Sequence, residues 1–293
     1  MAAVAMRDKR LTILGALALA LVGCSAPPAA PPALSPVAAE QPALPPPSRV
    51  AVQPQPAPPP PHQVAVERPA PPRAPGKPAA WKAVLIAGDD QERAFDDAVD
   101  AMAAKLHRFG VAGEDIAILK ASAQGADAAT GINIRQAFAD LHPGPRDGCF
   151  VYITSHGAPG RGLVMRRARA FLSPTGLGFM LGGSCGNRPT VVIASGCYSG
   201  IFATQAPMPA PNRTILTAAR DDRPSFGCNA NLDYTFFDKC ILDNLERGMD
   251  WRVVMDKTRA CVSGNEWDLH VNAPSEPQLS IGATTAGLRA FTP

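Results

Sequence analysis

Motifs that would identify common cofactor sites are missing from this sequence. The 293 residues contain no glycine-rich Walker loop, no His-Glu-x-x-His sequence and no Cys-x-x-Cys pair. These are patterns typical of nucleotide sites, zinc hydrolases and structural zinc sites, so we expect no cofactor and no metal ion. Aromatic residues are also scarce, at 6% of the chain, and residues 25–80 have none. We therefore expect the folded core to lie outside residues 25–80.

The part of the chain that is expected to fold has no excess of positive charge. The formal net charge is +3, but residues 1–24 and residues 25–80 contribute +2 each. Residues 81–293 therefore carry 21 basic and 22 acidic side chains, a net charge of −1. A domain that binds nucleic acid concentrates basic side chains on its folded surface, so we exclude nucleic acid as a partner.

The N-terminal apolar stretch is too short to span a bilayer. Residues 11–22 are mostly apolar and follow Arg7, Lys9 and Arg10, whereas a spanning helix needs about 20 apolar residues. A short apolar run behind a positive segment is typical of an export signal peptide. We therefore interpret residues 1–23 as a signal peptide.

The end of this stretch, Leu21-Val22-Gly23-Cys24, resembles the lipobox of bacterial lipoproteins. The resemblance implies that Cys24 is lipidated, and Ser25 in place of an aspartate favours the outer membrane. We expect a lipid-anchored protein of the bacterial cell envelope that faces the periplasm and is held to the membrane without spanning it. An ordinary signal peptide with a chance cysteine is the alternative.

The segment after the predicted signal peptide is rich in proline and offers little to bury. Residues 25–80 hold 20 of the 32 prolines, including four in a row at positions 58–61. Such runs favour an extended polyproline conformation without a packed core. We predict that residues 24–80 form a disordered, semi-rigid tether ahead of a globular domain at residues 81–293.

Residues 81–293 alternate between apolar runs typical of buried strands and segments with helical periodicity. We predict strands at residues 81–87, 116–119, 149–155, 190–195 and 214–218. Helices are expected where apolar residues recur at steps of three and four: Phe95, Val99, Met102, Leu106 and Phe109; Ile134, Phe138 and Leu141; Tyr234, Phe237, Ile241 and Leu245; Trp251, Val254, Thr258 and Cys261. Asp89 or Asp90 is expected to cap the first helix and Gly110 to end it. This alternation indicates a three-layer α/β fold with a mostly parallel sheet flanked by helices.

Two of the predicted strands end in residues suited to acyl transfer. The strand at 149–155 runs into His156-Gly157, and the strand at 190–195 runs into Gly196-Cys197. Ligands of open parallel sheets bind beyond the carboxyl ends of the strands. If the two strands are neighbours, about 4.8 Å apart, a thiol and an imidazole lie side by side, which is the minimum for nucleophilic acyl transfer. Gly157 and Gly196 would allow tight turns whose N–H groups point at an oxyanion.

Each of these residues also has an ordinary structural interpretation. His156 alone reads as a histidine at the end of a strand, and Cys197 alone reads as a small buried residue. Because both follow an apolar strand and have glycine beside them, the combination favours a catalytic pair.

The two motifs resemble those of the C13 (legumain-like) cysteine peptidases, a family of the caspase-like clan. One apolar strand ends in His156-Gly157, and some forty residues later another ends in a small residue and Cys197. The resemblance extends from about residue 81 to about residue 281 and includes Ser225-Phe226-Gly227-Cys228. It implies a caspase-like fold and a cysteine endopeptidase that acts on a peptide or protein.

The resemblance also implies catalytic roles. Cys197 would be the nucleophile that forms an acyl-enzyme, and His156 the general acid and base. The backbone N–H groups of Gly157 and Cys197 would form the oxyanion hole. No third catalytic residue is assigned, although Asp89 or Gln91 could orient the imidazole.

Three further residues are expected to contact the substrate. Arg93 matches a basic residue that lines the S1 pocket of legumain-like enzymes, although an exposed arginine at a helix start is equally expected there. Tyr198 directly follows the predicted nucleophile, and Ser225 opens the Ser225-Phe226-Gly227-Cys228 segment of the resemblance. Because Tyr198 replaces an acidic residue that helps legumain to recognise asparagine, a preference for asparagine is not implied.

Three other functions remain open at this point. The same pair of residues supports transpeptidation if an amine replaces water, and a catalytically idle caspase-like module would bind a partner at the envelope. The sequence Gly182-Gly183-Ser184-Cys185-Gly186 matches the G-x-S-x-G pattern of serine hydrolases. That pattern must follow a strand and open a helix, whereas here it precedes a predicted strand, so we interpret it as a chance match.

Seven cysteines leave an odd number once two are assigned. With Cys24 assigned to lipid and Cys197 to catalysis, the remaining five cannot all pair within the chain. An exported protein permits disulfides. Cys240 and Cys261 lie on consecutive predicted helices, so we predict a bridge between them.

Overall fold

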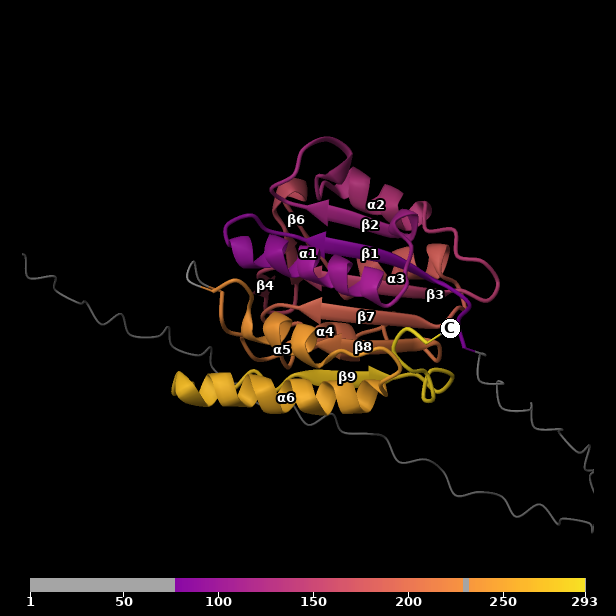
Figure 1. The fold of residues 1–293 in the computed structure, drawn as a ribbon. Coiled ribbons are helices and arrows are strands. Elements are labelled where there is room, and N and C mark those ends of the chain that lie inside the picture. The colour runs from indigo at the N-terminus through magenta and orange to yellow at the C-terminus, as the bar shows by residue number, and fades with distance from the viewer. Residues whose placement is uncertain (1–76, 229–231, 293) are drawn as a thin grey trace, which may run out of the picture. The chain divides into compact units, whose positions relative to one another are not determined.

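The computed structural model describes residues 77–228 and 232–292 (Figure 1). The predicted signal peptide, Cys24 and residues 24–76 of the predicted tether lie outside these residues. The last tether residues already contact the domain, because the Ala79 N–H donates to the Arg146 carbonyl at 2.7 Å and the Gly148 N–H donates to the Ala80 carbonyl at 2.9 Å. No helix in the described ranges has the length and apolar character needed to cross a membrane.

The central sheet has six strands in the order β2-β1-β3-β7-β8-β9. Their bounds are β1 Trp81–Ala87, β2 Ile116–Lys120, β3 Gly148–Thr154, β7 Thr190–Ser195, β8 Arg213–Thr217 and β9 Gln278–Ile281. The first five are parallel, and β9 pairs antiparallel with β8 at the edge. The arrowheads of β1, β2 and β7 point to the left in Figure 1, so the carboxyl edge of the parallel strands lies on that side.

Helices cover both faces of this sheet. The helices are α1 Arg93–Arg108, α2 Gly131–Ala139, α3 Pro174–Ser184, α4 Ile201–Thr204, α5 Phe236–Asn244 and α6 Trp251–Asp268, with short 3-10 turns at Gly113–Asp115, Gly125–Asp127 and Arg166–Ala168. α1, α5 and α6 share a hydrophobic core with Phe150 and Tyr152 of β3, and α2, α3 and α4 share another with Val151 and Ile153. Successive side chains of β3 therefore pack into the cores on opposite faces of the sheet. The predicted three-layer α/β fold with a mostly parallel sheet is confirmed.

The first helix shows where the sequence-based prediction succeeded and where it was wrong. The predicted apolar face is buried, since Phe95, Val99, Met102 and Leu106 are fully covered. Gly110, with φ +93°, follows the end of the helix as expected. The predicted cap was wrong, because α1 begins only at Arg93 and its N-cap residue, Glu92, makes no side-chain cap hydrogen bond. Asp89 is buried in the turn that precedes Glu92, and there it accepts from the Gln91 N–H at 3.0 Å.

A second, smaller sheet follows β3 and was not predicted. It consists of β4 Gly157–Ala158, β5 Gly162–Met165 and β6 Ala170–Leu172, which pair antiparallel in this order. The carbonyl of His156 accepts from the Val164 N–H at 2.8 Å, so this hairpin is anchored to the end of β3.

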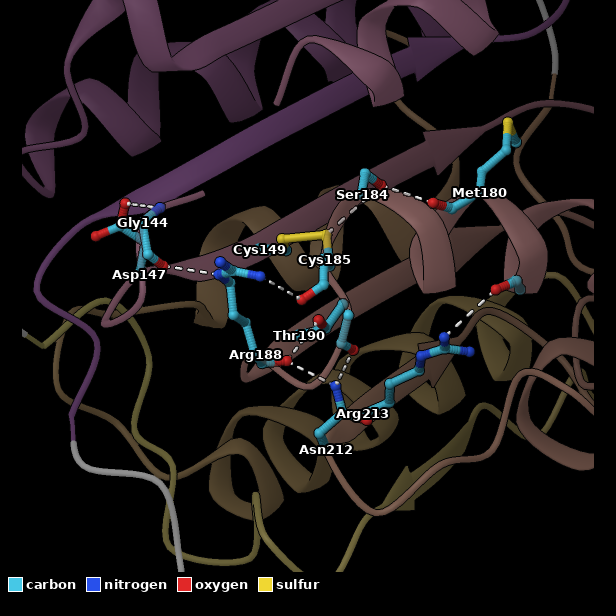
Figure 2. Close-up of a disulfide and its surroundings, with 12 residues drawn as sticks. Gly144, Asp147, Cys149, Met180, Ser184, Cys185, Arg188, Thr190, Asn212 and Arg213 are labelled. Carbon is cyan, nitrogen blue, oxygen red and sulfur yellow. Dashed lines mark hydrogen bonds between the residues drawn. A yellow bond between two sulfur atoms is a disulfide. The ribbon is translucent and has the colours of Figure 1, made fainter. Parts of the chain in front are cut away.

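Two disulfides cross-link the domain, one on each side of the sheet. The predicted Cys240–Cys261 bridge is confirmed and joins α5 to α6, with a Cα–Cα distance of 5.7 Å. A second bridge, which was not predicted, joins Cys149 at the start of β3 to Cys185 at the end of α3, with a Cα–Cα distance of 6.2 Å (Figure 2). Cys197 and Cys228 are the described cysteines that remain as thiols.

Candidate active site

His156 and Cys197 emerge at the same edge of the sheet from neighbouring strands. β3 and β7 pair in parallel with Thr154 opposite Ser195, the last residue of each strand. His156 and Cys197 therefore each lie two residues beyond one register pair. The pairing continues past the strands, because the Ser155 N–H donates to the Ser195 carbonyl at 3.1 Å. The condition assumed for the catalytic pair, that these two strands are neighbours, therefore holds.

The two loops that carry these residues touch one another at their glycines. A Cβ atom added to Gly157 would lie 1.9 Å from the carbonyl oxygen of Cys197, and one added to Gly196 would lie 2.4 Å from the carbonyl oxygen of Ser155. Real Cβ atoms essentially never come within 3.0 Å of such atoms. Each loop thus needs glycine where the backbone of the other passes, and this close approach brings the imidazole and thiol segments together.

The thiol of Cys197 lies against the segment that follows β8. The N–H of Ser225 donates to Sγ at 3.3 Å, the Ser225 hydroxyl lies 3.7 Å from Sγ, and Sγ lies 3.5 Å from the Ser225 carbonyl oxygen. The next residue, Tyr198, has φ +58°, and its N–H donates to the Arg223 carbonyl at 2.8 Å. Ser225, which was expected to contact the substrate, thus lies against the sulfur of the predicted nucleophile; its contact with substrate stays a prediction.

The imidazole of His156 packs on the first turn of α1. Its ring stands edge-on to the ring of Phe95, with centroids 5.1 Å apart and an interplanar angle of 85°. Phe95 is itself fully buried, so it gives the imidazole a rigid apolar support. The carboxylate of Asp89 lies 3.7 Å from a nitrogen of Arg166 and accepts from the main chain of Gln91. The contacts of Asp89 thus run to Arg166 and Gln91 rather than to the imidazole.

Arg93 is the first residue of α1 and is widely exposed, with 81% of its side chain accessible. Its guanidinium donates to Asp97 at 2.8 Å and lies 3.9 Å from the carboxylate of Asp233, which is 80% accessible. Asp233 precedes α5, so the two side chains connect the segments that begin α1 and α5. Sequence reasoning missed Asp233, because an exposed carboxylate in a loop has no distinguishing pattern.

Sequence reasoning also missed a buried carboxylate, which packs against the end of β3. Asp238 of α5 is 0% exposed and accepts from the Tyr152 hydroxyl at 2.6 Å, the Thr154 hydroxyl at 2.6 Å and the Thr235 hydroxyl at 2.8 Å. The Ser195 side chain, which is opposite Thr154 in the sheet, also favours the charged form of this carboxylate. Burial raises the pKa of Asp238, although the hydrogen bonds oppose the shift. Burial and the neighbouring Asp238 likewise raise the pKa of Tyr152 well above its ordinary value, so the phenol stays protonated.

The second thiol, Cys228, differs from an activated nucleophile. Burial, followed by the neighbouring Cys197 and Asp238, raises its pKa to about 12. At neutral pH it is therefore a protonated thiol and a poor nucleophile.

The serine of the G-x-S-x-G pattern lies away from these residues. Ser184 is the last residue of α3, and its hydroxyl donates to the Met180 carbonyl at 2.7 Å (Figure 2). It adjoins Cys185, which is bridged to the amino end of β3, whereas Cys197 lies beyond the carboxyl end of β7. The interpretation of this pattern as a chance match agrees with its position.

Comparisons with known proteins agree with this geometry. The model of the peptidase C13 family matches residues 132–253, a range that includes His156 and Cys197. Among solved structures, caspase-1 from Spodoptera frugiperda is similar, with a TM-score of 0.52 at 12% identity over 74% of this chain and 92% of that chain. No curated protein matches the sequence significantly. The caspase-like fold expected from the sequence is thus confirmed, and the match over residues 132–253 supports the expected C13 family.

Proposed function

We propose that this chain, whose residues 132–253 match the peptidase C13 family and which is in general terms a cysteine peptidase, cleaves peptide bonds with Cys197 and His156. The observation that carries the proposal is the contact of the two glycine loops, which holds both residues beyond a single register pair of β3 and β7. In this mechanism the Cys197 thiolate attacks the scissile carbonyl and forms an acyl-enzyme. His156 protonates the departing amine and then activates the water that releases the acyl group.

The proposal includes an oxyanion hole made by the N–H groups of Gly157 and Cys197. Both residues lie at the contact between the two loops, where the backbone of Cys197 passes too close to Gly157 to leave room for a side chain. Donors fixed in this way stabilise a developing negative charge without reorganisation during the reaction.

The proposal is tested with the full chain and three variants. Wild-type protein should hydrolyse members of a fluorogenic peptide library and become labelled once by a peptidyl acyloxymethyl ketone. The C197A variant should lose both properties, and H156A should lose hydrolysis. The C228A variant is the matched control and should keep both, because the Cys228 thiol is protonated and not involved. Hydrolysis that survives in C197A would disprove the assignment, and a wild-type protein that neither turns over nor becomes labelled would favour an idle binding module.

We also propose that Arg93, Tyr198 and Ser225 contact the substrate. The support is their position, since Arg93 is exposed at the start of α1 while Tyr198 and Ser225 adjoin the thiol. The R93A variant should raise KM, and K257A, an exposed lysine of α6, should leave it unchanged. Equal KM values for R93A and wild type would remove Arg93 from the substrate site.

Anchoring through Cys24 at the periplasmic face of the outer membrane is a further part of the proposal and rests on the sequence. Expression of the full chain in a bacterial host should place it in the membrane fraction, and C24S should release it. If C24S stays in the membrane fraction to the same extent, the lipid anchor is refuted.

A further inference from the structure

Asp238 lies at the ends of the two strands that lead to the catalytic residues. Thr154 and Ser195 are opposite one another in the sheet; the Thr154 hydroxyl donates to the Asp238 carboxylate at 2.6 Å, and the Ser195 side chain also favours the charged form of this carboxylate. Each hydroxyl lies two residues before a catalytic residue, Thr154 before His156 and Ser195 before Cys197. The carboxylate thus lies beside the ends of both strands, two residues before the reacting group along each strand.

The same helix turn is also linked to the nucleophile from the other side. The N–H of Phe236, the first residue of α5, donates to the Phe226 carbonyl at 3.1 Å. Phe226 follows Ser225, whose N–H donates to the Cys197 sulfur. The first turn of α5 therefore contacts β3 through Asp238 and the segment that covers Cys197 through Phe236.

Helix capping accounts for only one of these contacts. Thr235 is the N-cap of α5, and it accepts from the Asp238 N–H at 3.2 Å while its hydroxyl donates to the Asp238 carboxylate. A capping pair of this kind forms equally well at an exposed helix end. It requires neither complete burial nor hydroxyl groups from the sheet, and burying a carboxylate carries a large desolvation penalty. The sheet contacts therefore need another explanation.

We propose that Asp238 is a positioning residue, whose carboxylate fixes the ends of β3 and β7 and thereby sets the separation of the His156 imidazole from the Cys197 thiol. This inference rests on the proposed function of these two residues. It assigns no proton transfer to Asp238, which touches neither reacting group and acts only through the hydroxyls of Thr154 and Ser195.

The test uses variants in the full chain with the C228A background, so that alkylation reports on Cys197. D238N keeps the size of the side chain, and T154V and S195A each remove one of the strand hydroxyls. The matched control is E266Q, because Glu266 of α6 is also a buried carboxylate, 4% exposed, that accepts from the Ser275 N–H at 3.0 Å. The measurements are kcat and KM on a cleaved peptide, and the rate of Cys197 alkylation by iodoacetamide, which needs no substrate.

D238N should lower kcat by about 10- to 100-fold, because displacements of about 1 Å between reacting groups have effects of this size. KM should stay within about threefold, and E266Q should leave kcat within about twofold of the background. T154V and S195A should each lower kcat, and neither should lower it further by more than about twofold when combined with D238N, because both act through the same carboxylate. A merely structural role would give additive losses.

The outcomes separate the two hypotheses. If D238N leaves both kcat and the alkylation rate within twofold, or if E266Q loses as much as D238N, the positioning role is overturned while the proposed function stands. If no peptide is cleaved but D238N still slows alkylation of Cys197 about fivefold or more, the proposed function fails and the positioning role stands. Should D238N not fold, T154V and S195A decide, and unchanged alkylation in both would overturn the inference.

Discussion

Replacing Gly157 by alanine tests the closest contact of the site. The new methyl carbon would lie 1.9 Å from the Cys197 carbonyl oxygen, 2.9 Å from its carbonyl carbon and 3.2 Å from its nitrogen. All three are backbone atoms, so no side-chain rotation relieves the overlap. The His156 loop and the Cys197 loop must separate instead.

The size of the effect follows from this overlap. To reach the 3.0 Å that real Cβ atoms respect, the two loops must move apart by about 1 Å, and a misplacement of about 1 Å between reacting groups lowers rates by about 100-fold. Overpacking of this kind destabilises a protein by about 1–3 kcal/mol. For a domain of this size each kcal/mol lowers Tm by about 2–4 °C. The fold should therefore survive while activity falls far more than stability.

The assay compares G157A with G182A. An alanine at position 182 in α3 meets nothing within 4 Å, and it should stabilise the helix by up to about 1 kcal/mol. Peptide turnover and the rate of Cys197 alkylation report on the site, and thermal unfolding reports on the fold. If G157A keeps kcat within about threefold of wild type, the loops do not fix the reacting groups and the reasoning is refuted.

Three further predictions concern the cysteines and the buried carboxylate. Removing the Cys149–Cys185 bridge should lower the free energy of unfolding by about 4 kcal/mol, from the loop-entropy relation for a separation of 36 residues, and should leave kcat nearly unchanged. Denaturant titration measures the first quantity and steady-state kinetics the second. A large loss of kcat in the fully folded variant would contradict this prediction. Iodoacetamide at pH 8 should alkylate Cys197 well before Cys228, whose pKa burial raises to about 12; peptide mapping over time tests the order, and equal rates would refute it. The pKa of Asp238 is raised in the folded state. Its contribution to the free energy of unfolding is therefore fully present below the unfolded-state pKa of about 3.9, and it is lost as the pH rises through the folded-state pKa. The stability that D238N loses relative to wild type should therefore be larger at pH 4 than at pH 7, and a loss that grows with pH would show the opposite shift.

The sheet and the two candidate catalytic residues were predictable because their signals are local. β3 and β7 are continuous apolar runs, and such runs occur where helices cover both faces of a strand. Their order in the sheet was assumed rather than predicted, and the structure confirms it. His156 and Cys197 then followed from a general rule, since the carboxyl ends of parallel strands share one edge.

What escaped prediction depends on contacts between distant parts of the chain. Asp238 looks like a polar residue of an amphipathic helix, and only the packing of α5 on the sheet turns it toward Tyr152 and Thr154, 86 and 84 residues away. The small sheet of β4, β5 and β6 has strands of two to four residues, too short to show an alternating pattern. The Cys149–Cys185 bridge requires that the end of α3 return to the start of β3, which no local pattern reveals.

The two disulfides have a consequence for how the chain oxidises. From residue 149 onward the cysteines occur in the order 149, 185, 197, 228, 240 and 261, and each bridge joins a cysteine to the next one in that order. Neither closed loop therefore contains a further cysteine that could compete for its bridge. The proposed nucleophile, Cys197, lies between the two closed loops, so neither bridge requires its thiol.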